Sequence, residues 1–98
     1  MKYLKQYESR SNWTYKYLRN RQEEETFIED CIFNYCILNK IIEEYYYLDN
    51  FLFLNNKILV NATDTNSIHE SYYIKDIDDF ILYMNNPKEY QETKKYNI

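Results

Sequence analysis

RQEEETFIEDCIFNYCILNKIIEEYYYL, residues 21–48, is the stretch that decides the fold we expect. It contains no glycine or proline, and its apolar residues recur at spacings of three and four, the pattern of one helix face. The members of this stripe are Ile28, Cys31, Tyr35, Leu38, Ile42 and Tyr45. Asn20 and Glu23 have the spacing of a capping box at the start, and Asp49-Asn50 provides a stop. The stretch therefore predicts one long helix that forms the main wall of the core.

The apolar surface of this helix is wider than a single stripe. Five further apolar residues broaden it: Phe27, Ile32, Ile37, Ile41 and Leu48. Such a helix must be covered on more than one side, and at 1.5 Å per residue it would be about 42 Å long. We expect it to pack across the protein's own sheet. The alternative is a coiled-coil stripe through which two copies form a homodimer.

The composition indicates one small domain and excludes several kinds of binding site. The 98 residues are 45% hydrophobic and include thirteen tyrosines, five phenylalanines and one tryptophan, so we expect an aromatic core. Glycine is absent, which excludes the glycine-rich loops that bind phosphates and dinucleotides. Asparagine and aspartate must form the turns instead. The bias towards Asn, Ile, Lys and Tyr is typical of AT-rich codons and indicates a virus, a plasmid or their low-GC host.

The cysteines and the polar breaks in the apolar runs bear on cofactors and location. Cys31 and Cys36 lie five residues apart on the predicted helix, a spacing that neither bridges them nor binds zinc. We expect two small buried side chains in a reducing compartment, with no metal and no cofactor. No apolar signal segment opens the chain, and polar residues interrupt residues 45–60, so we expect no membrane span. The expected location is the cytoplasm, that of the host cell if the protein is viral.

Residues 1–20 form a basic, aromatic N-terminal element that admits three interpretations. Three aromatic residues alternate with other residues between positions 13 and 17, which favours a strand near residues 12–18. A hairpin with residues 2–7 as its first strand is one alternative. A single helix through residues 2–20 is the other.

The chain after the long helix predicts a meander of three strands and a second helix. Two short runs that are apolar on both faces surround Asn55-Asn56, which is typical of a hairpin in a sheet covered on both sides. A third strand follows a polar loop, and Asp76 caps the second helix. The strands are expected at residues 51–54, 57–60 and 68–74, the second helix at 76–85 and a polar tail at 87–98.

The predicted fold class is therefore α+β, in a single domain of residues 1–98. One long central helix packs on a small antiparallel sheet of three to four strands, formed by residues 51–74. A short second helix lies near the C-terminus.

We expect no enzymatic activity. His69 is the only histidine, and a catalytic histidine needs a nucleophile or an orienting carboxylate beside it. Glu70 and Ser71 adjoin it only in sequence, so we expect a histidine at the sheet margin. The carboxylates at the two helix starts lack a calcium-loop pattern, and we expect solvated first turns there.

Charge is distributed unevenly along the chain. Residues 1–21 carry six basic residues against Glu8, a net charge of +5, whereas the whole chain carries −4 and residues 22–98 therefore carry −9. A basic aromatic arm can bind nucleic acid, with cations on phosphates and a ring stacked on a base. The residues that would do so are Lys5, Arg10, Trp13, Lys16, Arg19 and Arg21. Because the whole chain is acidic, we favour an arm that folds back on the acidic body.

The acidic body favours binding to a basic surface of another protein. Its carboxylates can take the places of phosphates, and tyrosines are good interface anchors. The expected contacts are Glu23, Glu24, Glu25, Glu43, Glu44, Tyr45, Tyr46, Tyr47, Asp76, Asp78 and Asp79. We expect a non-enzymatic inhibitor, encoded by a virus or mobile element, that binds a host protein such as a nucleic-acid-directed defence nuclease, for example a CRISPR effector. The alternative is a small nucleic-acid-binding or regulatory protein that uses the N-terminal arm.

Overall fold

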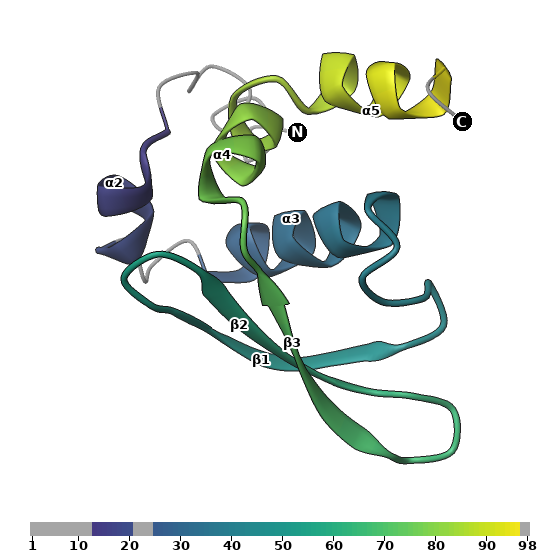
Figure 1. Cartoon of the computed structure of the whole chain (residues 1–98). Coiled ribbons are helices and arrows are strands. Elements are labelled where there is room, and N and C mark those ends of the chain that lie inside the picture. The colour runs from purple at the N-terminus through teal and green to yellow at the C-terminus, as the bar shows by residue number, and fades with distance from the viewer. Residues whose placement is uncertain (1–12, 21–24, 97–98) are drawn as a thin grey trace.

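The computed structural model describes residues 13–20 and 25–96, and it confirms the predicted α+β class. A three-stranded antiparallel sheet in the order β1-β2-β3 lies on one side of helices α3, α4 and α5 (Figure 1). The elements in chain order are α2 (Tyr15–Arg19), α3 (Glu25–Leu38), β1 (Tyr47–Phe53), β2 (Ile58–Thr63), β3 (His69–Ile74), α4 (Ile77–Asn85) and α5 (Pro87–Tyr96). Two helices therefore follow the sheet, where one helix and a polar tail were predicted.

The prediction of a single long central helix is wrong. Helix α3 has only 14 residues and ends before Lys40, which adopts a left-handed conformation with φ of 57°. The Lys40 N–H donates to the Ile37 carbonyl oxygen over 3.1 Å. The Ile41 N–H donates to the Cys36 carbonyl oxygen over 2.8 Å. These two bonds form a Schellman motif, a helix end in which glycine usually takes the left-handed position. Glycine at that position would have predicted a helix end, whereas lysine does not.

Within its true length, α3 is the wall of the core. Its buried residues are Ile28, Cys31, Ile32, Tyr35 and Cys36. The helix lies between the sheet and α4 (Figure 1), so its wide apolar surface is covered within the chain. Both cysteines are free and buried, as predicted, and burial is the main cause that raises the pKa of each thiol to about 12. The predicted homodimer depended on helical surface beyond Leu38. Because α3 ends at Leu38, that surface is not helical.

The strands follow the predicted meander with different boundaries. Strand β1 begins at Tyr47, inside the predicted helix, and it pairs antiparallel with β2 through a register that contains one bulge. Asn55 and Asn56 form the predicted tight turn, in which the Leu54 N–H donates to the Lys57 carbonyl oxygen over 2.9 Å. Strand β2 pairs antiparallel with β3. The sheet was predicted to be covered on both sides, but α3 lies against one side only, with α4 and α5 beyond it, and no described helix covers the other side (Figure 1).

The described part of the N-terminal element is a short helix, and the strand predicted there is wrong. The Thr14 hydroxyl accepts a hydrogen bond from the Tyr17 N–H over 3.1 Å and caps α2. Trp13 is buried, and its backbone N–H and carbonyl both pair with the side-chain amide of Asn85, at 2.6 and 3.2 Å. This segment therefore folds back onto the end of α4. The second strand of the alternative hairpin would fall on α2 and is wrong for the same reason, whereas its first strand, residues 2–7, lies outside the described residues. A single helix through residues 2–20 is also wrong, because the backbone of Thr14 is extended.

Tyr15 ties α2 to the turn between β1 and β2. Its hydroxyl lies 2.5 Å from the Leu54 carbonyl oxygen and 2.8 Å from the Lys57 carbonyl oxygen. Burial raises the pKa of this phenol, and the nearby Arg19 charge opposes the shift. The hydroxyl therefore stays a donor and holds both ends of the turn.

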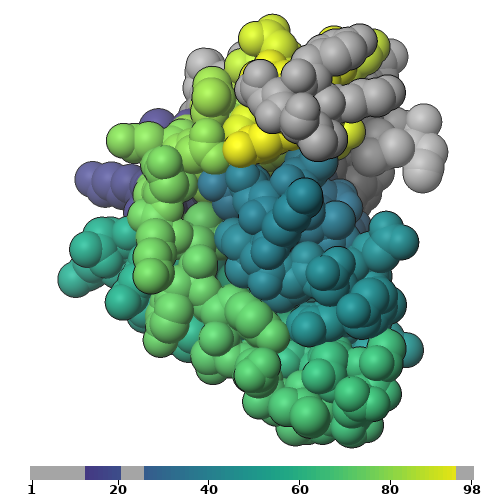
Figure 2. Space-filling model, turned by 45° about the vertical axis from the view of Figure 1, so that its right-hand side comes forward, coloured from purple at the N-terminus to yellow at the C-terminus, as the bar shows by residue number. Residues whose placement is uncertain are grey.

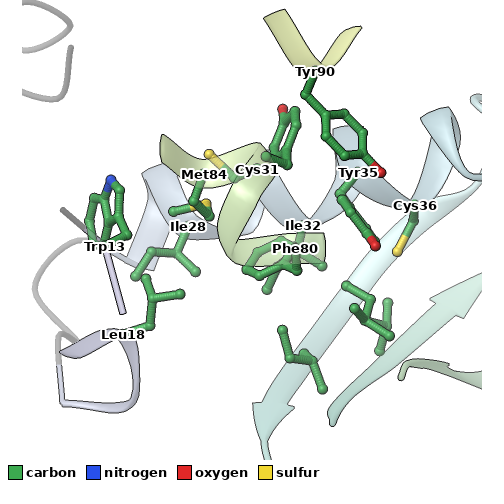
Figure 3. Packing of buried hydrophobic residues seen from close by; sticks show 14 of the residues in the cluster. Trp13, Leu18, Ile28, Cys31, Ile32, Tyr35, Cys36, Phe80, Met84 and Tyr90 are labelled. Carbon is green, nitrogen blue, oxygen red and sulfur yellow. The ribbon is translucent and has the colours of Figure 1, made fainter. Parts of the chain in front are cut away.

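The C-terminal third begins as predicted and ends differently. The Asp76 carboxylate accepts a hydrogen bond from the Asp79 N–H and caps α4, which ends at Asn85 as expected. The expected polar tail is instead helix α5, on which Tyr90 is only 6% exposed. Figure 3 shows Tyr90 pointing from α5 towards Tyr35 of α3. Among residues 87–94 of this helix, whose side chains are described, Tyr90 is the only buried one.

Candidate functional site

One end of the molecule gathers acidic residues and tyrosines from a loop and a neighbouring hairpin. The loop between α3 and β1 lies beside the hairpin between β2 and β3, because Tyr47 pairs with Thr63 and Thr63 pairs with His69. Figure 2 shows this hairpin at one end of the molecule, opposite α5. We call the surface the acidic end, and it comprises Glu43, Glu44, Tyr45, Tyr46, Asp64, Ile68, Glu70 and Tyr72.

A chain of aromatic contacts joins the two parts of the acidic end. The ring centroids of Tyr45 and Tyr46 lie 5.4 Å apart, and those of Tyr46 and Tyr72 lie 6.4 Å apart. The Tyr72 hydroxyl donates to the Glu70 carboxylate over 3.3 Å. Burial first, and then the Glu70 charge and hydrogen bonding to Tyr46, raise the pKa of Tyr72 to about 12. The protonated phenol therefore holds the Glu70 carboxylate beside the loop.

The side chain of Asp64 fixes the tip of the β2–β3 hairpin. Asp64 Oδ1 accepts hydrogen bonds from the Asn66 N–H over 2.8 Å and from the Ile68 N–H over 3.0 Å. Ser67 completes the turn in a left-handed conformation with φ of 64°. Aspartate commonly organises turns in this way. The turn presents Ile68 to solvent, where it is 52% exposed.

The acidic end has no basic side chain of its own to neutralise it. Glu43, Glu44, Asp64 and Glu70 carry a formal charge of −4, and residues 41–74 contain a single lysine and no arginine. That lysine, Lys57, lies at the β1–β2 turn, at the opposite end of the strands. Exposed apolar area therefore sits among carboxylates that no lysine or arginine in this stretch can pair.

The structure also places Asp49 and Thr63 beside His69, an arrangement that the sequence analysis missed. Thr63 Oγ1 lies 2.5 Å from Asp49 Oδ2 and 2.7 Å from His69 Nδ1, and that nitrogen lies 3.5 Å from the Asp49 carboxylate. The Thr63 hydroxyl donates its hydrogen to the carboxylate, so the histidine is not positioned to deprotonate it. With the His69 side chain 77% exposed, this is a surface hydrogen-bond network. This network can be recognised only from the strand register, and the register depends on where β1 begins.

The acidic residues predicted on the second helix do not belong to the acidic end. Strand β3 runs from His69 at the acidic end to Ile74 at the other end of the sheet, where α4 begins. Asp76 is occupied as the helix cap, and Asp78 is exposed in the first turn. The two predicted acidic clusters are therefore separated by the length of a strand.

Asp79 has an anchoring role that the sequence did not indicate. Asp79 Oδ2 accepts hydrogen bonds from the Tyr35 hydroxyl over 2.7 Å and from the Tyr90 hydroxyl over 2.5 Å. The Tyr90 hydroxyl also lies 3.1 Å from the Asn39 side-chain amide. Burial, followed by these bonds to Asp79, raises the pKa of Tyr35 above its ordinary value and that of Tyr90 to about 12. One carboxylate thus joins α3, α4 and α5.

The residues of the predicted nucleic-acid arm are divided between core and surface. Trp13 is 2% exposed and stacks on Phe27 at 6.0 Å, so its ring is not available to a base. Lys16 and Arg19 are exposed, and the Arg19 guanidinium reaches Asn55 Oδ1 over 3.4 Å. Several other predicted contacts fall outside the described residues: Lys5, Arg10, Arg21, Glu23 and Glu24. Glu25 is the first residue of α3.

Within residues 13–20 and 25–96, no three His, Cys, Asp or Glu side chains are grouped to hold a metal ion. No helix in this described part is both long and apolar enough to cross a membrane. Comparison of the chain with family models, curated proteins and solved structures returned no match.

Proposed function

We propose that this chain is a non-enzymatic interaction protein that binds a basic surface of a partner protein through its acidic end. The observation that carries this proposal is the gathering of four carboxylates and two exposed apolar side chains on the α3–β1 loop and the adjoining β2–β3 hairpin. Tyr45 is 58% exposed and Ile68 is 52% exposed. Apolar and aromatic anchors surrounded by charge are the usual composition of a protein interface.

The expected partner surface follows from the charge of the acidic end. Carboxylates spaced along a loop and a hairpin attract lysine and arginine side chains and raise the association rate. Proteins that bind nucleic acid carry such basic surfaces for phosphates. Carboxylates of the acidic end would occupy the places of phosphates on such a surface.

The composition narrows the proposal to an inhibitor encoded by a virus or mobile element. The AT-rich codon bias fits that origin, and an inhibitor needs only a complementary surface. A nucleic-acid-directed defence nuclease of the host, such as a CRISPR effector, is the partner class we propose. Loss of the nuclease's activity would be the measurable result.

The test compares two triple charge reversals that change the net charge equally. Glu43→Lys, Glu44→Lys and Glu70→Lys alter the acidic end, whereas Asp78→Lys, Glu89→Lys and Glu92→Lys alter exposed positions of α4 and α5. A partner captured from host lysate and purified is titrated with both variants. We expect the first variant to lose at least about tenfold in affinity and the second to lose less than about threefold. Equal losses would contradict the proposal.

The alternative, nucleic-acid binding by the N-terminal arm, needs a separate measurement. Lys16 and Arg19 remain exposed, although Trp13 is buried. A gel shift with single-stranded DNA or RNA at low salt, abolished by Lys16→Glu with Arg19→Glu, would favour this alternative over protein binding.

A further inference from the structure

Three tyrosine rings of the acidic end form a row between the α3–β1 loop and strand β3. Tyr45 and Tyr46 come from the loop, and their ring centroids lie 5.4 Å apart with an angle of 59° between the rings. The rings of Tyr46 and Tyr72 follow at 6.4 Å and 57°. Neither pair is a parallel stack, so the rings leave faces open to a ligand. We call these three residues the tyrosine row, and Tyr45 at its outer end is 58% exposed.

The tyrosine row and Glu70 share one side of the sheet. Tyr72 and Glu70 pair with Val60 and Ala62 of β2, which are buried on the side that faces α3. Cross-strand partners point to the same side of a sheet, so Tyr72 and the exposed Glu70 lie together on this side. We call the opposite side the open face, and its residues include Tyr47, Leu52, Leu59 and Asn61.

The tyrosine row lacks a cation that other tyrosines of the chain have. The Lys57 ammonium lies 4.6 Å from the centroid of the Tyr73 ring, and the Lys94 ammonium lies 5.4 Å from that of Tyr90. A cation within about 6 Å of a ring centroid is attracted by the negative face of the ring. Among the described residues, no lysine or arginine lies over a ring of the tyrosine row. The row therefore has an unused capacity to bind a cation.

The carboxylates beside the tyrosine row are also without a cation. Within the described residues, Glu43, Glu44 and Glu70 form no ion pair. The Tyr72 hydroxyl donates to the Glu70 carboxylate over 3.3 Å and fixes it at the edge of the row. Glu43 and Glu44 precede Tyr45 in the loop. A cation over the rings would therefore have carboxylates towards both ends of the row.

Of the cations that a protein surface presents, arginine fits this arrangement best. Its planar guanidinium stacks on aromatic rings and is more weakly hydrated than the lysine ammonium. Its N–H groups lie in the plane of the group, so a guanidinium over a ring can also donate to a carboxylate beside that ring. The compact ammonium of lysine has no flat surface to stack. Rings with a carboxylate at their edge therefore select arginine over lysine.

We infer that the tyrosine row receives one arginine side chain of the partner protein, an inference that rests on the proposed function of the acidic end. The guanidinium lies over the rings of Tyr46 and Tyr72 and donates to the Glu70 carboxylate. Tyr45, the exposed end of the row, covers the methylene groups of the arginine. The remaining carboxylates of the acidic end attract other cations of the partner's basic surface.

The test is a titration of the isotope-labelled full chain, followed by NMR, with three pentapeptides that are blocked at both ends. Their central residue is arginine, lysine or the neutral citrulline, flanked by serine and glycine. We expect the arginine peptide to bind with a dissociation constant of the order of 5 mM and to shift the amide signals of the tyrosine row. The lysine peptide should bind at least about threefold more weakly, and the citrulline peptide should not bind measurably up to about 20 mM.

Matched variants assign the binding to the rings and the carboxylate. Tyr46→Leu should weaken binding of the arginine peptide by about threefold or more, whereas Tyr46→Phe keeps the ring and should retain it. Tyr47→Leu is the control, because Tyr47 is 75% exposed and points to the open face, and it should leave binding unchanged. Glu70→Gln, at an exposed position, should also weaken binding by about threefold or more, and Glu89→Gln on α5 should not. Circular dichroism of each variant verifies that it is folded.

Three results would overturn the inference. They are no binding of the arginine peptide up to about 20 mM, equal binding of the arginine and lysine peptides, and equal losses for Tyr46→Leu and Tyr47→Leu.

Titration of the captured partner separates this inference from the proposed function. If reversing the charge of the acidic end weakens partner binding while Tyr46→Leu does not, the proposed function holds and the arginine contact is wrong. If the two triple charge reversals lose partner affinity equally while the arginine peptide binds the tyrosine row, the row binds arginine and the proposed function is wrong.

Discussion

The two faces of the sheet use the same strands but are stabilised in different ways. On β2, the alternate residues Ile58, Val60 and Ala62 are almost fully buried on the side that faces α3, whereas Leu59 and Asn61 between them, on the open side of the sheet, remain partly exposed. The covered face is held by apolar burial, and the open face by short hydrogen bonds between side chains. Apolar residues on both sides of a strand therefore do not imply cover on both sides.

The largest effect should come from truncating the covered face. Ile58→Ala removes a side chain that is 0% exposed, and it should lower the free energy of unfolding by about 2 to 4 kcal/mol. Leu52→Ala on the open face should change it by less than about 0.5 kcal/mol. Urea denaturation measures both. If the two losses were equal, the open face would be buried as well.

The second-largest loss of stability should come from removing the Asp79 carboxylate, which joins three helices on the covered side. Asp79→Ala leaves the Tyr35 and Tyr90 hydroxyls without their acceptor, and it should cost about 2 to 3 kcal/mol. Asp78→Ala, at the exposed neighbouring position, should cost less than about 0.5 kcal/mol. Urea denaturation of both variants makes the comparison. A small loss for Asp79→Ala would mean that solvent readily replaces this carboxylate.

A smaller effect, a gain in stability, is expected at the end of α3, next to the acidic end. Lys40→Gly relieves the left-handed backbone at the end of α3, and it should stabilise the fold by about 1 kcal/mol. Lys40→Ala keeps the Cβ atom in the same conformation and should bring no such gain. Thermal denaturation followed by circular dichroism distinguishes the two. Equal stabilities would show that the helix end tolerates a Cβ atom at no cost.

The smallest effect is the response of the covered side to alkali. The folded state raises the pKa of Tyr90 to about 12, whereas the unfolded chain ionises tyrosine near about pH 10. Unfolding therefore releases a proton above about pH 10, and stability falls as the pH rises towards about 12. Tyr90→Phe is less stable at neutral pH because it lacks the bond to Asp79. Its deficit against the unmodified protein should shrink between about pH 10 and about pH 12, and a constant deficit would contradict the shift.

The sequence predicted those parts of the fold that depend on local chemistry. The stripe from Ile28 to Tyr35, the Asn55-Asn56 turn and the Asp76 cap all follow from short-range patterns, and the structure contains them. The end of α3 could not be predicted because the decisive residue is a left-handed lysine. Because β1 begins at Tyr47, inside the predicted helix, the register of the sheet could not be predicted either.

The candidate site was predictable only in its loop. Glu43, Glu44 and Tyr45 were expected, and they lie exposed between α3 and β1. Asp64 and Glu70 join them through strand pairing, which brings together residues distant in sequence. The same long-range pairing creates the Asp49, Thr63 and His69 network. Trp13 could not be assigned to the core, because its partner Asn85 lies 72 residues away.

Helix α5 is built to open independently of the sheet. Among its residues 87–94, whose side chains the structure describes, Tyr90 is the only buried one, and its hydroxyl bonds the Asp79 carboxylate and the Asn39 side-chain amide. A segment with so little buried area detaches at a lower free energy than the global unfolding transition. Native-state hydrogen exchange should therefore find α5 amides exchanging by a sub-global opening, while the amides of β2 exchange only when the whole molecule unfolds.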